Sequence, residues 1–274
     1  MTTQASKASA FRALHEAAGA FIIANPWDVG TARILDQLGY KALATTSAGF
    51  AFSRGQRDNT ISRDEMMAHV SEIVDAVDLP VSGDLENGFG DAPETVAETI
   101  LKAAGAGLVS ASIEDSTGRT EDPLYGIELG VERIRAAVEA AQGLPIDFLI
   151  TGRAENFLVG RADLKHAIQR LQAYQDAGAD ILYAPGLTSM SDIATVVREV
   201  DRPLNVLMGL KGAQASLSEL ADIGVKRVSV GSALSRAALG AFLRASKEMI
   251  GPGTFSFAEE AAAFPEISAF MKTA

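Results

Sequence analysis

A glycine followed by a short apolar segment recurs four times in this chain of 274 residues, each time where a helical pattern ends. Glycine accepts the left-handed backbone conformation that closes an α-helix. Each copy therefore predicts a helix that ends and a strand that follows. The four copies span residues 38–43, 104–109, 177–182 and 223–228.

Four further apolar segments lie between these copies, at residues 21–23, 79–81, 146–150 and 203–207. Each of the eight segments precedes a stretch with helical periodicity, which gives a strand and a helix repeated eight times. This order predicts a (β/α)8 barrel of the TIM type over residues 1–250, with a doubly wound open sheet as the alternative.

The segment after the barrel, residues 251–274, holds more apolar side chains than a free chain end should expose. We expect a helical tail that packs on the barrel or on a neighbouring subunit. The apolar side chains are Phe255, Phe257, Phe264, Ile267, Phe270 and Met271.

Composition excludes several classes of protein. A formal net charge of −11 argues against nucleic acid or an anionic membrane surface as a partner. The chain has no cysteine, which excludes disulfides, a thiolate nucleophile and cysteine-ligated zinc. No apolar run has the length of a signal segment or a membrane span, so we expect a cytoplasmic protein.

Two carboxylates follow the apolar segment 79–81, in the sequence Asp84-Leu85-Glu86-Asn87-Gly88-Phe89-Gly90. Residues two apart on a strand point to the same side, and like charges held together favour a cation between them. Asp91 then has the position of a helix N-cap, with Pro93 and Glu94 in the first turn. We predict a strand with an acidic end, a turn and a helix.

Active sites of such barrels lie at the C-terminal ends of the strands. Acidic side chains are expected there from strands three, four and five: Asp84, Glu86 and Glu114. Oxygen ligands alone suit Mg²⁺, or Mn²⁺, better than zinc. Alternatively, these acids pair with Arg153 or cap helices. The polar residues at the predicted strand ends are Asn25, Trp27, Asp28, Thr45, Thr46, Ser47, Asp84, Glu86, Glu114, Asp115, Arg153, Glu155, Asn205, Ser229 and Ser232.

Small residues follow the second strand, at positions 45–49. They leave backbone N–H groups open to an anion such as a carboxylate, although a tight turn explains them equally well. Arg153 would add a forked donor to the same anion. The polar loop 116–123 is expected either to act as a gate over the site or to be an ordinary solvated loop.

The three histidines fall within helical segments, away from the expected site. We predict that His15, His69 and His166 are surface residues rather than ligands.

Several separate motifs resemble those of the isocitrate lyase and phosphoenolpyruvate mutase superfamily, over nearly the whole chain. Residues 84–90 resemble its metal-binding segment, and Glu114-Asp115 resembles the acidic pair after its fourth strand. Residues 46–48 are similar to its carboxylate-binding loop, Arg57-Asp58 to the pair that follows that loop, and residues 152–155 to its fifth strand end.

The resemblance implies a site for a small anionic 2-oxo acid. Asp84 would bind Mg²⁺ directly, while Glu86 and Glu114 would hold its waters. The amides of Ser47 and Ala48 would bind the substrate carboxylate, and Arg153 would neutralise a developing enolate. The implied catalytic residues are Arg153, Asp58 and Glu114. The implied substrate-binding residues are Thr45, Ser47, Ala48, Gly49, Arg153 and Asn205. Members of the superfamily form homodimers and homotetramers, often by exchanging a C-terminal helix.

The loop after the fourth strand departs from the family patterns. The cysteine-containing loop of the isocitrate and methylisocitrate lyases is replaced by residues 116–119, and the mutase segment by residues 120–123. We expect a Mg²⁺-dependent C–C lyase or decarboxylase that acts on a small 2-oxo or 2-hydroxy di- or tricarboxylate, such as oxaloacetate, through a pyruvate enolate. Two alternatives are a phosphonopyruvate or phosphoenolpyruvate mutase or hydrolase, and a non-catalytic 2-oxo acid binding protein.

Overall fold

Eight parallel strands form one sheet in the computed structural model, which describes residues 2–271. The sheet order is β1-β8-β7-β6-β5-β4-β3-β2. This confirms the (β/α)8 barrel and excludes the open doubly wound sheet. The strands are β1 Phe21–Ile23, β2 Leu43–Ala44, β3 Val81–Asp84, β4 Ser110–Glu114, β5 Leu149–Arg153, β6 Ile181–Tyr183, β7 Leu204–Leu207 and β8 Arg227–Ser229.

The barrel closes between β1 and β2 through a single bridge. Ala24 and Leu43 pair in parallel, and the amide of Ala44 donates to the carbonyl of Ala24 at 3.0 Å. The remaining neighbours pair over two to five residues each. The interior is therefore a nearly complete ring of inward-facing side chains.

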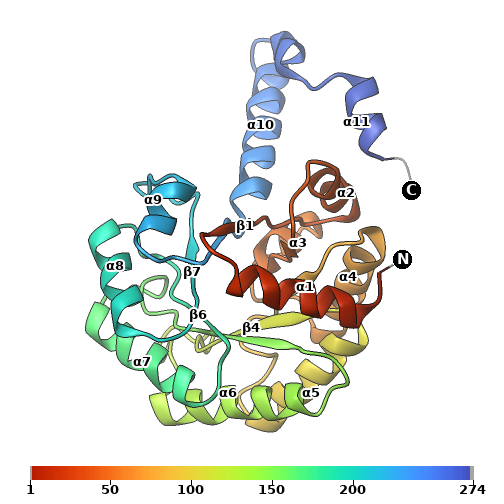
Figure 1. Cartoon of the computed structure of the whole chain (residues 1–274). Coiled ribbons are helices and arrows are strands. Elements are labelled where there is room, and N and C mark those ends of the chain that lie inside the picture. Colours follow the sequence, from red (N-terminus) through yellow and green to blue (C-terminus); the bar gives the residue numbers. More distant parts are fainter. Residues whose placement is uncertain (1, 272–274) are drawn as a thin grey trace.

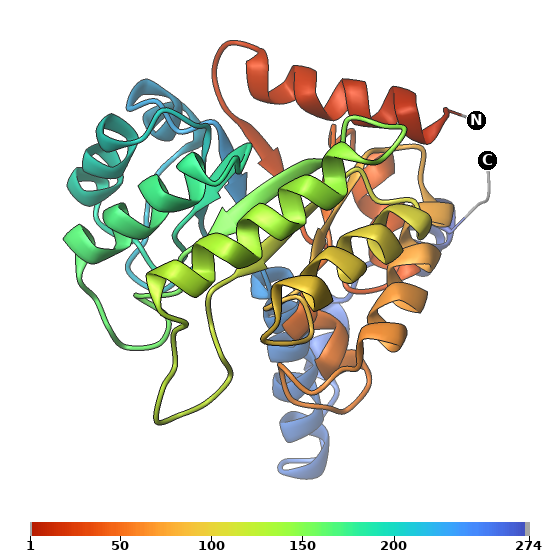
Figure 2. The same cartoon turned by 90° about the horizontal axis from the view of Figure 1, so that it is seen from below.

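Helices surround this ring on the outside (Figures 1 and 2). No helix among residues 2–271 is long and apolar enough to cross a membrane. The helices are α1 Gln4–Glu16, α2 Val29–Gln37, α3 Ser47–Ser53, α4 Arg63–Ala76, α5 Pro93–Gly105, α6 Ile127–Gln142, α7 Leu164–Asp176, α8 Met190–Glu199, α9 Leu217–Asp222, α10 Ala233–Ile250 and α11 Phe264–Phe270, with a 3₁₀ turn, η1, at Ser256–Glu260.

Helix starts follow local capping chemistry. Asp28 caps α2 by accepting from the amide of Thr31 at 2.7 Å. The prediction that Asp91 caps the next helix is wrong, because α5 begins one residue later, after Ala92, without a side-chain cap. The Asp91 carboxylate instead accepts from the Tyr125 hydroxyl at 2.6 Å and from Arg119 at 2.8 Å.

Several strands lie further along the chain than their apolar segments. The segment 104–109 was expected to contain the end of a helix and the start of a strand; α5 does end there, at Gly105, but the strand begins only at Ser110. β5 likewise extends to Arg153. The shift arises because the inward positions of these strands are polar, so an apolar pattern does not mark them.

Two of the three histidines are buried, which corrects the prediction that they are surface residues. His15 packs edge-on against Phe11 and Phe21 where α1 meets the start of β1. His69 stacks on Phe50 with ring centroids 3.8 Å apart. Only His166 is partly exposed, and its ring contacts Asn156 at 3.0 Å. All three lie in helices outside the pocket described below.

The C-terminal part of the chain leaves the barrel. Figure 1 shows α10 extending away from the barrel and α11 returning toward α2. The return is fixed by Gln37, whose side-chain amide donates to the carbonyl of Phe270 at 2.7 Å. Along α10 and the following residues, large apolar side chains are exposed: Leu239, Phe242, Leu243, Met249, Ile250, Phe255 and Phe264.

Candidate active site

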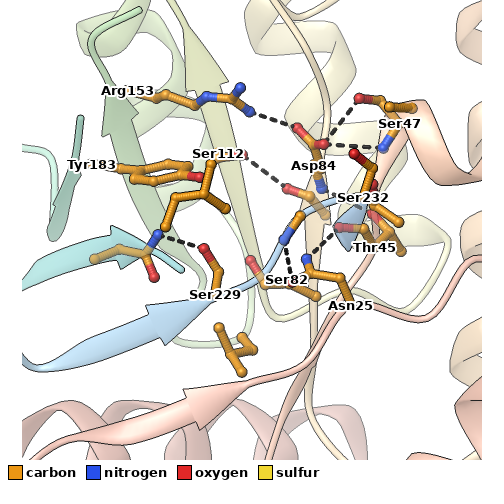
Figure 3. A pocket seen from close by; sticks show the side chains of 18 of the residues that line it. Asn25, Thr45, Ser47, Ser82, Asp84, Ser112, Arg153, Tyr183, Ser229 and Ser232 are labelled. Atoms are coloured by element: carbon orange, nitrogen blue, oxygen red, sulfur yellow. Dashed lines mark hydrogen bonds and ion pairs between the residues drawn. The ribbon is translucent and has the colours of Figure 1, made fainter. Parts of the chain in front are cut away.

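A cavity of about 150 Å³ opens at the C-terminal ends of the strands and reaches into the barrel (Figure 3). Most of the residues that line it have polar side chains. Seven of the residues that the resemblance implied as catalytic, substrate-binding or metal-binding line it: Thr45, Ser47, Ala48, Asp58, Asp84, Arg153 and Asn205. Four more residues from the predicted strand ends line it too: Asn25, Thr46, Ser229 and Ser232. The barrel therefore brings together the turn after β2, the start of α3, the loop after α3 and the strands β3, β5 and β7.

Arg153, the last residue of β5, is the centre of charge in this site. Its guanidinium lies 3.1 Å from Asp84 Oδ1 and 3.2 Å from Glu114 Oε2, and it also pairs with Glu155. One positive charge thus meets three carboxylates. Burial disfavours the cation, but the three carboxylates outweigh it and raise the pKa of Arg153 well above its ordinary value.

Asp84 is oriented by the end of β2 and the start of α3. The backbone amide and the hydroxyl of Ser47 each donate to Asp84 Oδ2 at 3.0 Å. Thr45 accepts from the amide of Asp84 at 2.9 Å, which fixes the end of β3. Figure 3 shows Arg153 and Ser47 approaching Asp84 from different sides.

Glu86 does not follow the strand geometry that the sequence suggested. β3 ends at Asp84, and Glu86 lies beyond it with a positive φ of 49°, so the alternation of a strand does not set its direction. Its side chain is buried outside the cavity wall, and its Oε1 atom has no hydrogen-bond partner. Burial, with Asp84 and Asp58 nearby, raises the pKa of Glu86 to about 8.

Glu114 is also outside the cavity wall, behind Arg153. Burial raises its pKa well above the ordinary value, although Arg153 opposes the shift. Asp115, the other acid of this pair, turns away from the site. It accepts from Tyr174 at 2.6 Å and from Arg170 at 2.9 Å, and so anchors the barrel wall.

The donor set fits a hard divalent cation. Negative charge is in excess around Arg153, and the buried Glu86 Oε1 atom lacks a donor. Within residues 2–271, no three His, Asp or Glu side chains are grouped to hold a metal directly. Direct binding by Asp84, with Glu86 and Glu114 acting through water, stays a prediction that is compatible with this arrangement.

Gly49 is separated from the cavity, unlike its neighbours Ser47 and Ala48. Its amide donates to the hydroxyl of Thr46, the N-cap of α3. A Cβ atom at position 49 would lie 2.6 Å from Cγ2 of Thr46 and 3.1 Å from Cβ of Trp27. Packing against the cap thus accounts for the small residue at this position.

Tyr183 faces the site rather than the outer layer. Its ring lies below the guanidinium of Arg153, with 5.1 Å from Cζ to the ring centroid. Ser82, Ser112 and Arg227 also line the cavity and were missed. Ser82 and Ser112 lie beyond the apolar segments that predicted their strands, and Arg227 is a polar residue inside such a segment, so apolar periodicity reveals none of the three.

The loop after β4 is tied at its base. Ser116 and Leu124 form an isolated antiparallel bridge, and the amide of Thr117 donates to the carbonyl of Pro123 at 3.0 Å. Its tip, residues 118–122, is exposed apart from the contact of Arg119 with Asp91. The loop is thus connected to the turn that follows β3.

Comparison with known proteins agrees with this geometry. The family model for phosphoenolpyruvate phosphomutase matches residues 11–250. A crystal structure from Burkholderia cenocepacia, assigned only broadly as a lyase or mutase, is 60% identical with a TM-score of 0.96, and the match covers 98% of this chain and 97% of that chain.

Two characterised relatives are more distant. The 2-methylisocitrate lyase of Salmonella typhimurium is 33% identical over 194 residues, which cover 68% of this chain and 64% of that protein. The oxaloacetate decarboxylase of Pseudomonas aeruginosa is 29% identical over 238 residues, which cover 84% and 81%. The chain belongs to the phosphoenolpyruvate phosphomutase family, within the isocitrate lyase and phosphoenolpyruvate mutase superfamily.

Proposed function

We propose that this protein is a Mg²⁺-dependent lyase that breaks a C–C bond next to the 2-oxo or 2-hydroxy group of a small carboxylic acid, with an oxaloacetate-like acid as the leading substrate. The observation that carries the proposal is the position of Arg153. It faces a small polar cavity while three carboxylates hold it in place. A donor fixed in this way loses little free energy to reorganisation when charge develops beside it.

Arg153 would act on the oxygen that becomes negative as the C–C bond breaks. Its guanidinium donates hydrogen bonds through two edges, and the site excludes most of the water that would weaken them. Removal of one such donor typically costs about 3 to 4 kcal/mol of transition-state stabilisation. Tyr183 below the guanidinium restricts its motion out of this position.

The size of the cavity favours a short substrate. A cavity of about 150 Å³ suits a compact acid such as a four-carbon diacid. One carboxylate of the substrate would lie at Ser47 and Ala48, next to Asp84.

Asp84 would hold the divalent ion directly, with Glu86 and Glu114 through water. When bound, Mg²⁺ would act as a Lewis acid toward the substrate oxygen and would balance the excess of carboxylates. The protein supplies the orientation: Ser47 fixes the carboxylate of Asp84, and Arg153 separates it from that of Glu114.

Simple C–C cleavage fits the residues that are present. Retro-aldol cleavage needs a base for the hydroxyl and a proton donor for the departing fragment, whereas decarboxylation needs only an electron sink. No histidine lines the cavity among the described residues, and the chain has no cysteine. Decarboxylation is therefore the leading reaction, in line with the relative that is an oxaloacetate decarboxylase.

A second candidate is P–C bond chemistry on phosphonopyruvate. The observation that favours it is the match of residues 11–250 to the phosphoenolpyruvate phosphomutase model. The same Arg153 and Asp84 would bind the 2-oxo acid end of this substrate.

The test is a panel of substrates with and without Mg²⁺. Purified protein is mixed with oxaloacetate, 2,3-dialkylmalates and phosphonopyruvate, and pyruvate, phosphoenolpyruvate and phosphate are measured. Mg²⁺-dependent pyruvate release from a carboxylic acid supports the proposal. Conversion of phosphonopyruvate alone supports the second candidate. Tight oxalate binding without turnover across the panel would mean a non-catalytic 2-oxo acid binding protein.

We also propose that the exposed face of α10 is covered by a second copy of this chain, in a homodimer or homotetramer. Phe242 and Leu243 are more than half exposed on this helix. Apolar surface of this kind favours association. The superfamily resemblance, with its exchanged C-terminal helices, points to the same partner.

A further inference from the structure

Arg227 is a buried arginine inside the barrel that has no acidic partner. It is the first residue of β8 and is only 4% exposed. Its Nε atom donates to Asn205 Oδ1 at 2.9 Å and its Nη2 atom to Thr151 Oγ1 at 3.2 Å. Its Nη1 atom has no hydrogen-bond partner, and residues 2–271 place no carboxylate within ion-pair distance.

The other buried arginines of the described chain are compensated. Arg153 meets three carboxylates, and Arg170 pairs with Asp115 at 2.9 Å. Arg133 donates to the backbone carbonyls of the turn after β3. Arg133 has no ion pair either, but it donates to three carbonyls, whereas Arg227 makes two hydrogen bonds and leaves Nη1 unpaired. A buried charge that is neither paired nor fully hydrogen-bonded is costly. Packing therefore does not explain why this position carries a guanidinium.

Arg227 lines the same cavity as Arg153. The two residues lie on one rung of the sheet, because Arg153 pairs with Tyr183, Tyr183 with Asn205 and Asn205 with Arg227. Three strand spacings of about 4.8 Å separate their Cα positions along the sheet. The cavity thus has a cation balanced by acids at one side and an uncompensated cation at the other.

Short hydroxyl side chains make part of the wall of the cavity that Arg227 lines. Ser82, Ser112 and Ser229 line the cavity, where bulky Val, Ile and Leu usually fill a barrel interior. Asn205 donates to the hydroxyl of Ser229 at 2.9 Å, which turns its carbonyl oxygen toward Arg227. These contacts fix the guanidinium and leave its buried Nη1 atom without a hydrogen-bond partner at the cavity wall.

We infer that Arg227 forms a second anion subsite at the floor of the pocket, which binds the second acidic group of a short diacid whose other end lies at Arg153 and Ser47. This inference rests on the proposed function and narrows its substrate to acids with two anionic ends. The second acidic group is a carboxylate or a phosphonate, because both present oxygens to a guanidinium. Asn205 and Thr151 are positioning residues for this subsite.

The test compares ligands that differ in one anionic group. Lactate, malate and 3-phosphonolactate are titrated calorimetrically into the Mg²⁺-loaded protein. Wild type should bind malate, 3-phosphonolactate or both at least tenfold more tightly than lactate, and the preferred ligand identifies the carboxylate or the phosphonate. Arg227→Met should lose the preference, with lactate affinity changed less than threefold.

Two further variants keep the test valid if Arg227→Met does not fold. Arg227→Lys keeps a cation and should retain part of the preference. Asn205→Asp places a carboxylate next to Nε of Arg227 as an internal counter-ion, and should also reduce the preference for a diacid. Circular dichroism confirms that each variant is folded.

The outcomes separate this inference from the proposed reaction. The subsite is overturned if wild type binds lactate, malate and 3-phosphonolactate with equal affinity. It is also overturned if folded Arg227→Met and Asn205→Asp keep the preference unchanged. Either result leaves Mg²⁺-dependent turnover standing. A preference that depends on Arg227, in a protein without turnover of any 2-oxo acid, establishes the subsite while the proposed reaction fails.

Discussion

Arg153 Nη1 lies 3.1 Å from Asp84 Oδ1, so an ion pair joins the ends of β5 and β3 across the pocket. The same Asp84 carboxylate receives two hydrogen bonds from Ser47. The side chains of Arg153 and Asp84 are therefore fixed by protein contacts alone. The pair therefore defines the geometry of the proposed reaction, and variants of its two members test different parts of it.

Replacement of Asp84 by asparagine should abolish metal binding. In wild type, Mg²⁺ should raise the midpoint of thermal unfolding in a concentration-dependent way, because a ligand that binds only the folded state stabilises it. Asp84→Asn keeps the side-chain shape but removes the charge, so its midpoint should not respond to Mg²⁺. Asp91→Asn is the matched control, since Asp91 binds Tyr125 outside the cavity. A full Mg²⁺ response in Asp84→Asn would place the metal elsewhere.

Acid should destabilise the protein partly through His15. Burial lowers the pKa of His15 to about 3, whereas an unfolded chain has a pKa near 6.5. Between these values the unfolded state binds a proton that the folded state does not, so the stabilisation is present above pH 6.5 and is lost as the pH falls. The slope approaches roughly 1.4 kcal/mol per pH unit near pH 5.

His15→Phe keeps an aromatic ring against Phe11 and Phe21 and removes this dependence. Urea denaturation at pH 7 and pH 5 measures the free energy of unfolding of both proteins. Wild type should lose more of this free energy than the variant between the two pH values. Equal losses would show that His15 is not the group responsible.

The turn after β3 depends on Arg133, which is 1% exposed. Its guanidinium donates to the carbonyls of Gly90 and Asp91 at 2.5 and 2.6 Å and also to that of Asn87. Arg133→Met leaves buried acceptors without donors, so the free energy of unfolding should fall by about 3 kcal/mol. Arg135→Met, at an exposed position of the same helix, should change it by less than about 0.5 kcal/mol. Similar values for the two variants would contradict this role.

The exposed face of α10 should govern the oligomeric state. Light scattering of wild type should give a dimer or tetramer, and Phe242→Glu should shift it to a smaller species, because a buried charge at an apolar interface is costly. Arg244→Gln, at an exposed position two residues away, is the matched control. A monomeric wild type, or an unchanged mass in Phe242→Glu, would contradict the proposed assembly.

The barrel was predictable because its signals are local. A glycine after a helix and an apolar segment after the glycine depend on residues close in sequence, and Asp28 and Thr31 likewise cap α2 from within one turn. The acidic end of β3 was visible for the same reason. What the sequence did not show is the direction of Glu86, because a backbone with φ of 49° departs from the strand pattern that was assumed.

Other features depend on contacts between distant segments. Asp91 meets Tyr125 and Arg119 instead of capping α5, and His15 is buried because Phe21 of β1 packs against α1. Arg227 lies in a segment that reads as an ordinary strand, and only the closed barrel places it in the pocket. Such positions follow from closure of the sheet, which no local pattern describes.

The most direct test of the proposed chemistry is Mg²⁺-dependent pyruvate release from oxaloacetate by wild type, Arg153→Lys and Arg153→Met, each checked for folding by circular dichroism. Wild type should turn over with Mg²⁺ and stop when the metal is chelated. Both variants should lose at least about 10²-fold in kcat, because lysine keeps the charge but not the forked donor. Unchanged kcat in folded Arg153→Met would contradict the central role of Arg153.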